Sequence, residues 1–174
     1  LFTAHEAARG GRRVAVLERG RVGDPATASF GRTRSYRRDY LDPVYARLAD
    51  EAIRLWGVFE ADTGTEVLVR CGCMNIATAS VTPDLGGTYA GRTTDVLRRL
   101  GMPLESYDAE GVRQRYPYLR ADVADNDPAG GLVNLPAVTG ALRRSLGDAV
   151  RERVDVTAVD VLGDGVRVVT AGDG

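Results

Sequence analysis

Lysine is absent from the 174 residues, so all 23 basic residues are arginine, and the chain has one histidine. There are only two cysteines, Cys71 and Cys73, and no second cluster of ligands accompanies them, which argues against a metal site. The net charge of −1 gives no reason to expect nucleic acid or an acidic membrane as a partner. No apolar run reaches the roughly 20 residues of a membrane-spanning helix, and no secretory signal is visible. We therefore expect a cytoplasmic protein.

Both ends of the sequence look interrupted. Residues 1–9 have the pattern of a helix but no capping residue before it, and residues 172–174 form a turn that no strand follows. The apolar run at residues 14–17 is typical of a strand buried on both faces of a parallel sheet. We expect an internal segment of a longer protein, whose glycine-rich nucleotide-binding turn would precede Leu1.

The long helix is the clearest local prediction. Asp42 is a good N-cap, Pro43 suits the first helical position, and Gly64 ends the apolar periodicity. The other expected elements are a strand at residues 67–77, a helix at 82–101, a short strand at 104–107, a brief helix that Asp108 caps and that stops before Pro117, a loop at 122–131, a helix at 135–146 and a hairpin formed by residues 154–162 and 166–170.

Three side chains have simple structural interpretations. A strand over residues 67–77 would place Cys71 and Cys73 on the same face, as buried or half-buried thiols. His5 lies among alanines on the first helix and is predicted to be partly exposed.

One stretch points to a family. Residues 28–37 read Ala-Ser-Phe-Gly-Arg-Thr-Arg-Ser-Tyr-Arg and follow, after a short loop, the apolar run that ends in Glu18. They resemble the Ser-Ser-His-Gly-x-Thr-Arg-x-x-Arg string of the D-amino-acid-oxidase superfamily, in its monomeric sarcosine oxidase and N-methyltryptophan oxidase branch. Residues 108–117 resemble the Asp-Ala-x-x-Leu-x-x-x-Phe-Pro pattern of that branch, and residues 129–131 resemble its Ala-Gly turn.

The resemblance implies an α/β fold. We expect an incomplete FAD/NAD(P)-binding Rossmann-like domain that carries an inserted α+β portion of a substrate domain. The expected division is residues 1–64 for the first part of the FAD-binding domain, 65–130 for the substrate-domain portion, and 131–174 for the return to the FAD-binding domain.

The predicted cofactor-binding residues lie at the end of the strand before the family string, in the string itself, and at the start of the C-terminal hairpin. An acid at the end of the second strand, here Glu18 followed by Arg19, accepts hydrogen bonds from a ribose and disfavours a 2′-phosphate, although the same geometry would serve NAD. The resemblance selects FAD. It also implies that the small residues Ala28, Ser29 and Gly31 pass over the pyrophosphate and flavin, and that the backbone of Val154 holds the adenine edge.

Two arginines are candidate catalytic residues. Taken alone, Arg34 and Arg37 read as solvated arginines in an arginine-rich chain. The resemblance implies instead that Arg34 lies near the flavin and that Arg37 receives the substrate carboxylate, for which a guanidinium is a natural bidentate donor. Phe30 departs from the histidine of the family string, which favours a bulkier, more apolar amine than sarcosine.

The reaction follows from the same resemblance. It implies FAD-dependent oxidation of a secondary amine or N-alkyl amino acid, with a hydride equivalent passing to flavin N5 and reoxidation by O2 giving H2O2. We expect the segment by itself to be inactive. Two alternatives remain open: a flavin-dependent D-amino-acid or 2-hydroxyacid dehydrogenase, and a non-catalytic FAD-like binding scaffold.

Overall fold

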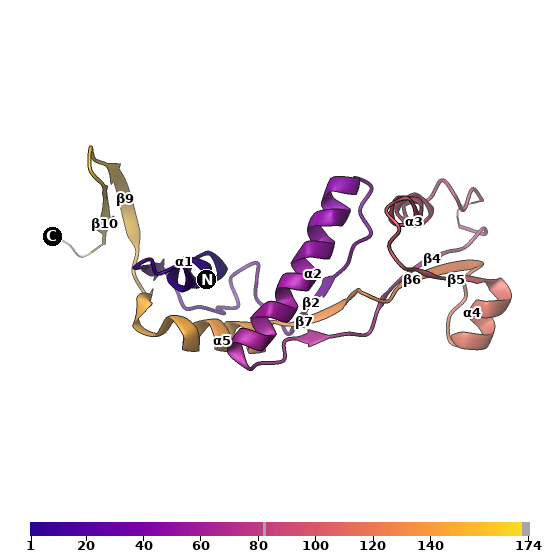
Figure 1. The fold of residues 1–174 in the computed structure, drawn as a ribbon, viewed down its shortest axis with the longest axis horizontal. Coiled ribbons are helices and arrows are strands. Elements are labelled where there is room, and N and C mark those ends of the chain that lie inside the picture. Colours follow the sequence, from indigo (N-terminus) through magenta and orange to yellow (C-terminus); the bar gives the residue numbers. More distant parts are fainter. Residues whose placement is uncertain (82, 172–174) are drawn as a thin grey trace. The chain divides into compact units, whose positions relative to one another are not determined.

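The computed structural model describes residues 1–81 and 83–171 of the chain. It contains two compact units, which are distinguished by the density of contacts within each. Unit 1 comprises Leu1–Arg32 with Leu135–Gly174, and unit 2 comprises Thr33–Asn134. The domain boundaries predicted after residues 64 and 130 differ from this division into contact units, and as domain boundaries of the longer protein they stay a prediction. Figure 1 shows the elements of each unit.

Unit 1 combines two helices with short strands. In chain order its elements are α1 (Phe2–Arg9), β1 (Val16–Glu18), α5 (Leu135–Leu146), a 3-10 turn (Gly147–Ala149), β8 (Val150–Glu152), β9 (Val156–Val161) and β10 (Val166–Thr170). The strand predicted at residues 14–17 is β1, and it begins two residues later than expected. It pairs in parallel with β8, which the sequence did not reveal, and Glu18 lies beside Glu152.

The two helices of unit 1 enclose His5. This side chain is 4% exposed, and its Nδ1 lies 2.8 Å from Oγ of Ser145 on α5. The prediction of a partly exposed histidine was therefore wrong. The reason is that α5, distant in sequence, covers the face of α1 that carries His5 and buries Leu142 and Leu146 of its own.

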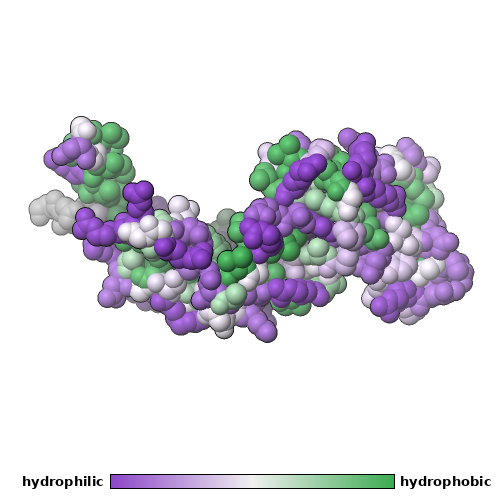
Figure 2. Space-filling model, viewed as in Figure 1, coloured by the Kyte–Doolittle hydropathy of each residue, from purple (hydrophilic) through white to green (hydrophobic). Residues whose placement is uncertain are grey.

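The hairpin of unit 1 is confirmed. β9 and β10 pair antiparallel, with Val161 opposite Val166 at the turn. Apolar side chains are exposed along both strands and at the turn between them, and Figure 2 shows the resulting hydrophobic surface; they are Val156, Val159, Val161, Leu162, Val166 and Val168. A surface of this kind is typical of a contact with further protein.

Unit 2 is built on two antiparallel three-stranded sheets. Its elements are β2 (Thr33–Tyr36), α2 (Pro43–Thr63), β3 (Leu68–Val69), β4 (Cys73–Ala77), α3 (Tyr89–Arg99), β5 (Glu105–Asp108), α4 (Ala109–Arg115), β6 (Val123–Asp127) and β7 (Gly131–Asn134). One sheet has the order β2-β7-β3 and the other β4-β6-β5. Ala46 of α2 packs with Val96 and Leu97 of α3 in a small core. In the described part of the chain, no helix has the length and apolar character needed to cross a membrane.

The long helix α2 forms as predicted. The carboxylate of Asp42 accepts a hydrogen bond from the backbone N–H of Val44 at 2.8 Å, and Pro43 occupies the first turn. Gly64 ends the helix in the left-handed region with φ 60°. These caps are local chemistry, which is why the sequence predicts both ends of this helix.

The stretch at residues 122–131, predicted as a loop, contains the central strand of one sheet and the beginning of the central strand of the other. β6 lies between β4 and β5, and β7 lies between β2 and β3. β6 was predicted as part of a loop because its last three residues are polar: Asp125, Asn126 and Asp127. Each finds a partner far away in sequence: Arg98, Glu105 and Arg38, respectively.

The continuous strand predicted at residues 67–77 is broken in two. β3 and β4 belong to different sheets, and Gly72 between them has φ 76° while its N–H donates to Gly130 O at 3.0 Å. Cys71 lies in this break and is exposed, whereas Cys73 is half-buried. The expectation of two sheltered thiols on one strand face was therefore wrong for Cys71.

The second predicted helix is shorter than expected. It begins at Tyr89 rather than near Pro83, and it ends at Arg99. At its start, the Thr88 hydroxyl accepts a hydrogen bond from the Gly91 N–H at 3.0 Å. Before it, Asp84 accepts from the backbone N–H of Gly87 in a turn. Thr82, the first residue of the predicted helix, lies outside the described residues.

Gly131 permits the close packing of β7 between its two neighbours. An added Cβ would clash with the Val69 carbonyl oxygen and lie 2.6 Å from the Tyr36 hydroxyl. We expect Gly131→Ala to lower the free energy of unfolding by about 1–3 kcal/mol, the usual cost of overpacking. Gly57→Ala is the matched control, because nothing lies within 4 Å of its added Cβ in helix α2, and it should stabilise by about 0.5–1 kcal/mol. Urea unfolding of both variants checks this; equal effects would contradict the packing argument.

Candidate functional site

Glu18 lies at the carboxyl end of β1, where parallel sheets bind their ligands. It is half-buried, and its Oε1 accepts a hydrogen bond from the backbone N–H of Gly20 at 2.7 Å. Within the described residues this is the one hydrogen bond of the Glu18 carboxylate, so Oε2 is available to a hydroxyl. The following residue, Arg19, is exposed.

Val154 lies directly beside this acid. Its backbone N–H donates to the carbonyl oxygen of Glu18 at 3.0 Å, just as Arg153 N–H donates to Gly20 O at 3.0 Å. The structure therefore brings two of the predicted cofactor residues together. Because the Val154 N–H already donates to Glu18 O, the backbone group of Val154 that could contact adenine is its carbonyl.

The small-residue turn after β1 is organised by Asp24. The carboxylate of Asp24 accepts from Ala26 N–H at 2.8 Å, and its carbonyl accepts from both the N–H and the hydroxyl of Thr27. Ala28 and Ser29 are exposed in this turn. Gly31 has φ 143°, a backbone conformation that favours glycine. An exposed turn of small residues leaves room for a phosphate or a ring close to the backbone.

The two candidate catalytic arginines belong to unit 2. Arg34 is exposed on β2, and its Nη1 donates to the carbonyl of Thr33 at 2.9 Å. Arg37 follows the strand, with 38% of its side chain exposed. The guanidinium of Arg37 lies 5.7 Å from the centre of the Tyr40 ring, a cation–π contact.

Arg37 is held by a buried carboxylate that the sequence did not single out. Nη1 of Arg37 donates to Oδ2 of Asp39 at 2.7 Å, and the Asp39 side chain is only 3% exposed. Burial acts to lower the pKa of Arg37, but its hydrogen bonds to Asp39 and Tyr89 outweigh burial and raise that pKa above its ordinary value. Arg37 therefore carries a full positive charge at any physiological pH.

Two further side chains fix Asp39 in place. Asn75 of β4 donates to Oδ2 of Asp39 at 3.2 Å, and the Tyr89 hydroxyl at the start of α3 donates to the Asp39 carbonyl at 2.7 Å. Asn75 and Tyr89 also line a pocket of about 400 Å³, whose other walls include Ile76, Ala77, Val81 and Ala90. The charged cluster of Arg37 and Asp39 is thus adjacent to residues of a largely apolar recess.

The neighbouring Arg38 has a different environment. It is 4% exposed and forms two hydrogen bonds to the buried Asp127, at 3.0 and 2.5 Å, with a third to Asp50 at 2.8 Å. The hydrogen bonds that Arg38 donates to Asp127 raise the pKa of Arg38 despite its burial. With both its edges occupied by carboxylates, Arg38 joins β6 to the N-terminal half of α2 and is a structural residue.

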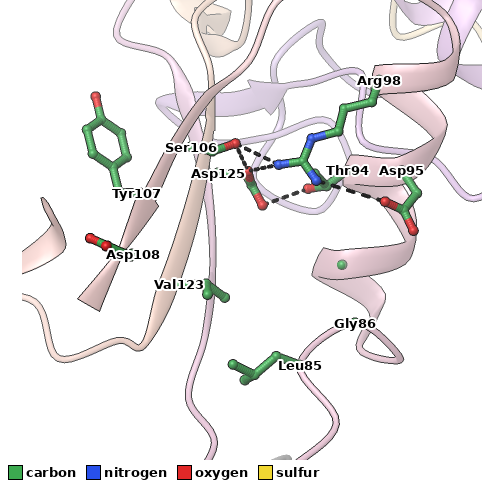
Figure 3. Close-up of a pocket in the computed structure, with 11 residues that line it drawn as sticks. Leu85, Gly86, Thr94, Asp95, Arg98, Ser106, Tyr107, Asp108, Val123 and Asp125 are labelled. Carbon is green, nitrogen blue, oxygen red and sulfur yellow. Dashed lines mark hydrogen bonds and ion pairs between the residues drawn. The ribbon is translucent and has the colours of Figure 1, made fainter. Parts of the chain in front are cut away.

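A second pocket of unit 2, of about 320 Å³, lies between α3 and the strands β5 and β6 (Figure 3). Asp125 points into the centre of its polar cluster, where it accepts from Arg98 at 3.1 Å, from Thr94 at 3.1 Å and from Ser106. These polar groups are satisfied by one another. The pocket therefore offers a closed hydrogen-bonding network and contains none of the predicted site residues.

The chain matches the model of the FAD dependent oxidoreductase family over residues 1–174, and it belongs to that family. Its sequence is 26% identical over 165 residues to human peroxisomal sarcosine oxidase, covering 91% of this chain and 41% of that protein. The chain thus spans less than half the length of this relative.

Solved structures show the same fold. Glycine oxidase from Geobacillus kaustophilus superimposes with a TM-score of 0.77 at 22% identity, over 97% of this chain and 48% of that one. L-proline dehydrogenase from P. horikoshii gives a TM-score of 0.77 at 20% identity, over 96% of this chain and 45% of that one. The predicted family and the predicted α/β FAD-binding fold are therefore confirmed.

FAD is the cofactor of this family, and the residues present fit it. Glu18 offers a carboxylate oxygen at the carboxyl end of a parallel strand, and the turn through Gly31 exposes small residues. The roles of Glu18, Arg19, Ala28, Ser29, Gly31, Val154, Arg34 and Arg37 stay predictions. The sequence did not reveal Asp39, although an acid two residues after a candidate arginine was a readable signal.

Proposed function

We propose that the full-length protein oxidises a secondary amine or an N-alkyl amino acid, with O2 as the electron acceptor. When bound, FAD supplies the chemistry by accepting the hydride equivalent that leaves the substrate carbon. Membership of the FAD dependent oxidoreductase family and the similarity to peroxisomal sarcosine oxidase support this reaction class.

The observation that carries the proposal is the arrangement of Arg37. A partly exposed guanidinium held from one edge by a buried acid can offer N–H groups that Asp39 does not use to an incoming anion. A carboxylate of an amino-acid substrate matches this donor geometry, since guanidinium and carboxylate form parallel hydrogen bonds. In this proposal Arg37 binds and orients the substrate, while Arg34 contributes positive charge near the flavin.

The cofactor residues of unit 1 would act through binding alone. Glu18 would accept a ribose hydroxyl at Oε2, and the turn of Ala28, Ser29 and Gly31 would admit the pyrophosphate close to the backbone. Phe30, 49% exposed in that turn, favours an amine with an apolar substituent.

A substrate panel tests the proposal. The purified full-length protein, loaded with FAD, is supplied in air with N-methyl amino acids, D-amino acids and 2-hydroxy acids, and peroxide is measured. We expect peroxide from the N-methyl amino acids above all. Substrate turnover with a dye acceptor but no peroxide would favour a dehydrogenase, and no turnover of any substrate would favour a binding scaffold.

Glu18→Ala tests the cofactor assignment separately. We expect a loss of roughly 1.5–3 kcal/mol in FAD affinity, the range for a hydrogen bond to a charged group. Equilibrium dialysis or flavin fluorescence of the full-length protein measures it, provided that the flavin is not covalently attached. Glu6→Ala, on the exposed face of α1 and paired with Arg9, is the control and should retain FAD like the parent protein. Unchanged FAD affinity of Glu18→Ala would remove this residue from the ribose.

A further inference from the structure

Asp39 is unusual among the acids of unit 2 because it is almost fully buried and meets a partly exposed arginine. Only Oδ2 of its carboxylate is engaged, by Arg37 Nη1 at 2.7 Å and by Asn75 Nδ2 at 3.2 Å. Within the described residues, the buried Oδ1 has no hydrogen-bond partner. Because a buried carboxylate oxygen without a donor costs stability, Asp39 is poorly explained as a stabilising residue alone.

The position of Asp39 is set by three separate elements. It follows β2, its side chain is held by Asn75 of β4, and its carbonyl is held by the Tyr89 hydroxyl at the start of α3. An acid fixed in this way defines where a cation beside it must lie. The long side chain of Arg37 has many rotamers, and its ion pair with Asp39 selects one of them.

We propose that Asp39 is a positioning residue, which holds the Arg37 guanidinium so that its remaining N–H groups are oriented before the substrate carboxylate arrives. This inference rests on the proposed function, because it specifies how the carboxylate-binding arginine of that function is prepared. Holding the arginine in advance means that less conformational entropy is lost when the anion binds.

The proposal also distinguishes Asp39 from Asp50, one of the two acids that contact the neighbouring Arg38. Asp39 contacts Arg37 and is 3% exposed, whereas Asp50 contacts Arg38 and is 51% exposed. Asp39 should therefore control binding of carboxylates, and Asp50 should not. Removal of Asp39 should affect only ligands that use Arg37, which a general structural role would not do.

The experiment measures two quantities on the FAD-loaded full-length protein. Propionate, an unreactive carboxylate, is titrated by calorimetry, and KM and kcat are determined for an N-methyl amino acid and for the same amine without its carboxylate. For Asp39→Ala we expect about 10- to 100-fold weaker propionate binding and a similar rise in KM for the amino acid alone, the scale of a misplaced binding group. Asp39→Asn, which keeps the shape and one acceptor oxygen, should show a smaller loss in the same direction.

Asp50→Ala is the control and should leave both quantities unchanged. In an Arg37→Met background, Asp39→Ala should cause no further loss, because the group that it positions is gone. Equal losses for both amines, an additive loss in the double variant, or no loss in Asp39→Ala and Asp39→Asn would overturn the inference. Wild-type protein that binds propionate through Arg37 and Asp39 but oxidises no amine would contradict the proposed function and leave the positioning role supported.

Discussion

Replacing Arg38 with methionine is expected to lower the free energy of unfolding by about 3–5 kcal/mol, the cost of leaving a buried charge without its partner. In the parent protein two guanidinium N–H groups bind the Asp127 carboxylate, at 3.0 and 2.5 Å. Without Arg38, the hydrogen bond that remains to this carboxylate from the described residues is the one donated by the Ala129 backbone N–H at 3.0 Å. Urea unfolding of the FAD-loaded full-length protein measures the loss.

Two variants separate this ion pair from other effects of the substitution. Asp50→Asn removes only the half-exposed partner of Arg38 and should cost at most about 1 kcal/mol. The double variant Arg38→Met with Asp127→Leu should recover most of the stability, because it buries no charge. The explanation fails if Arg38→Met is no more harmful than Asp50→Asn, or if the double variant is as unstable as the single one.

Replacing Arg37 with methionine should have its main effect on substrate binding. We expect KM for an N-methyl amino acid to rise tens- to thousands-fold, corresponding to about 2–5 kcal/mol for truncating one partner of a buried charge pair. The same amine without a carboxylate should be affected far less, since it makes no contact with the guanidinium. Steady-state kinetics, normalised to the flavin content of each preparation, compares the two substrates.

The comparison between substrates is needed because Arg37 also neutralises the buried Asp39. Some loss of stability in Arg37→Met is expected on that ground and would lower the amount of active protein for every substrate. It would not change KM selectively. Equal losses for amines with and without a carboxylate would place Arg37 in a structural role only.

The sequence predicted those parts of the fold that local chemistry determines. Helix α2 has its capping acid, its proline and its terminal glycine within its own sequence, and both ends were predicted correctly. The β9–β10 hairpin likewise follows from a glycine-rich turn between two apolar runs. The family was predicted from the string at residues 28–37 without any structure, and that prediction is confirmed.

The parts that were missed depend on partners distant in sequence. β6 ends in Asp125, Asn126 and Asp127, which resemble a solvated loop until Arg98, Glu105 and Arg38 are placed beside them. His5 was predicted to be partly exposed because Ser145 of α5 is 140 residues away. No periodicity in a single segment reports such pairings.

In the candidate site, too, the features that depend on partners distant in sequence were not predicted. Glu18 and Val154 were predicted separately as cofactor residues, and the structure joins them by a backbone hydrogen bond that the sequence did not predict. The distinction between Arg37 and Arg38, adjacent in the chain, was inaccessible to composition or spacing. It arises because Asp127 and Asp50 surround Arg38, while Asp39 occupies only one edge of Arg37.

The most direct test of the proposed oxidase function is an anaerobic half-reaction. The FAD-loaded full-length protein is mixed without oxygen with an N-methyl amino acid, the flavin absorbance is followed, and air is then admitted. The expected result is bleaching of the flavin at a rate that saturates with substrate, followed by rapid recovery in air with one H2O2 formed per flavin. A flavin that stays oxidised with every secondary amine, or a bleached flavin that air reoxidises without peroxide, would contradict it.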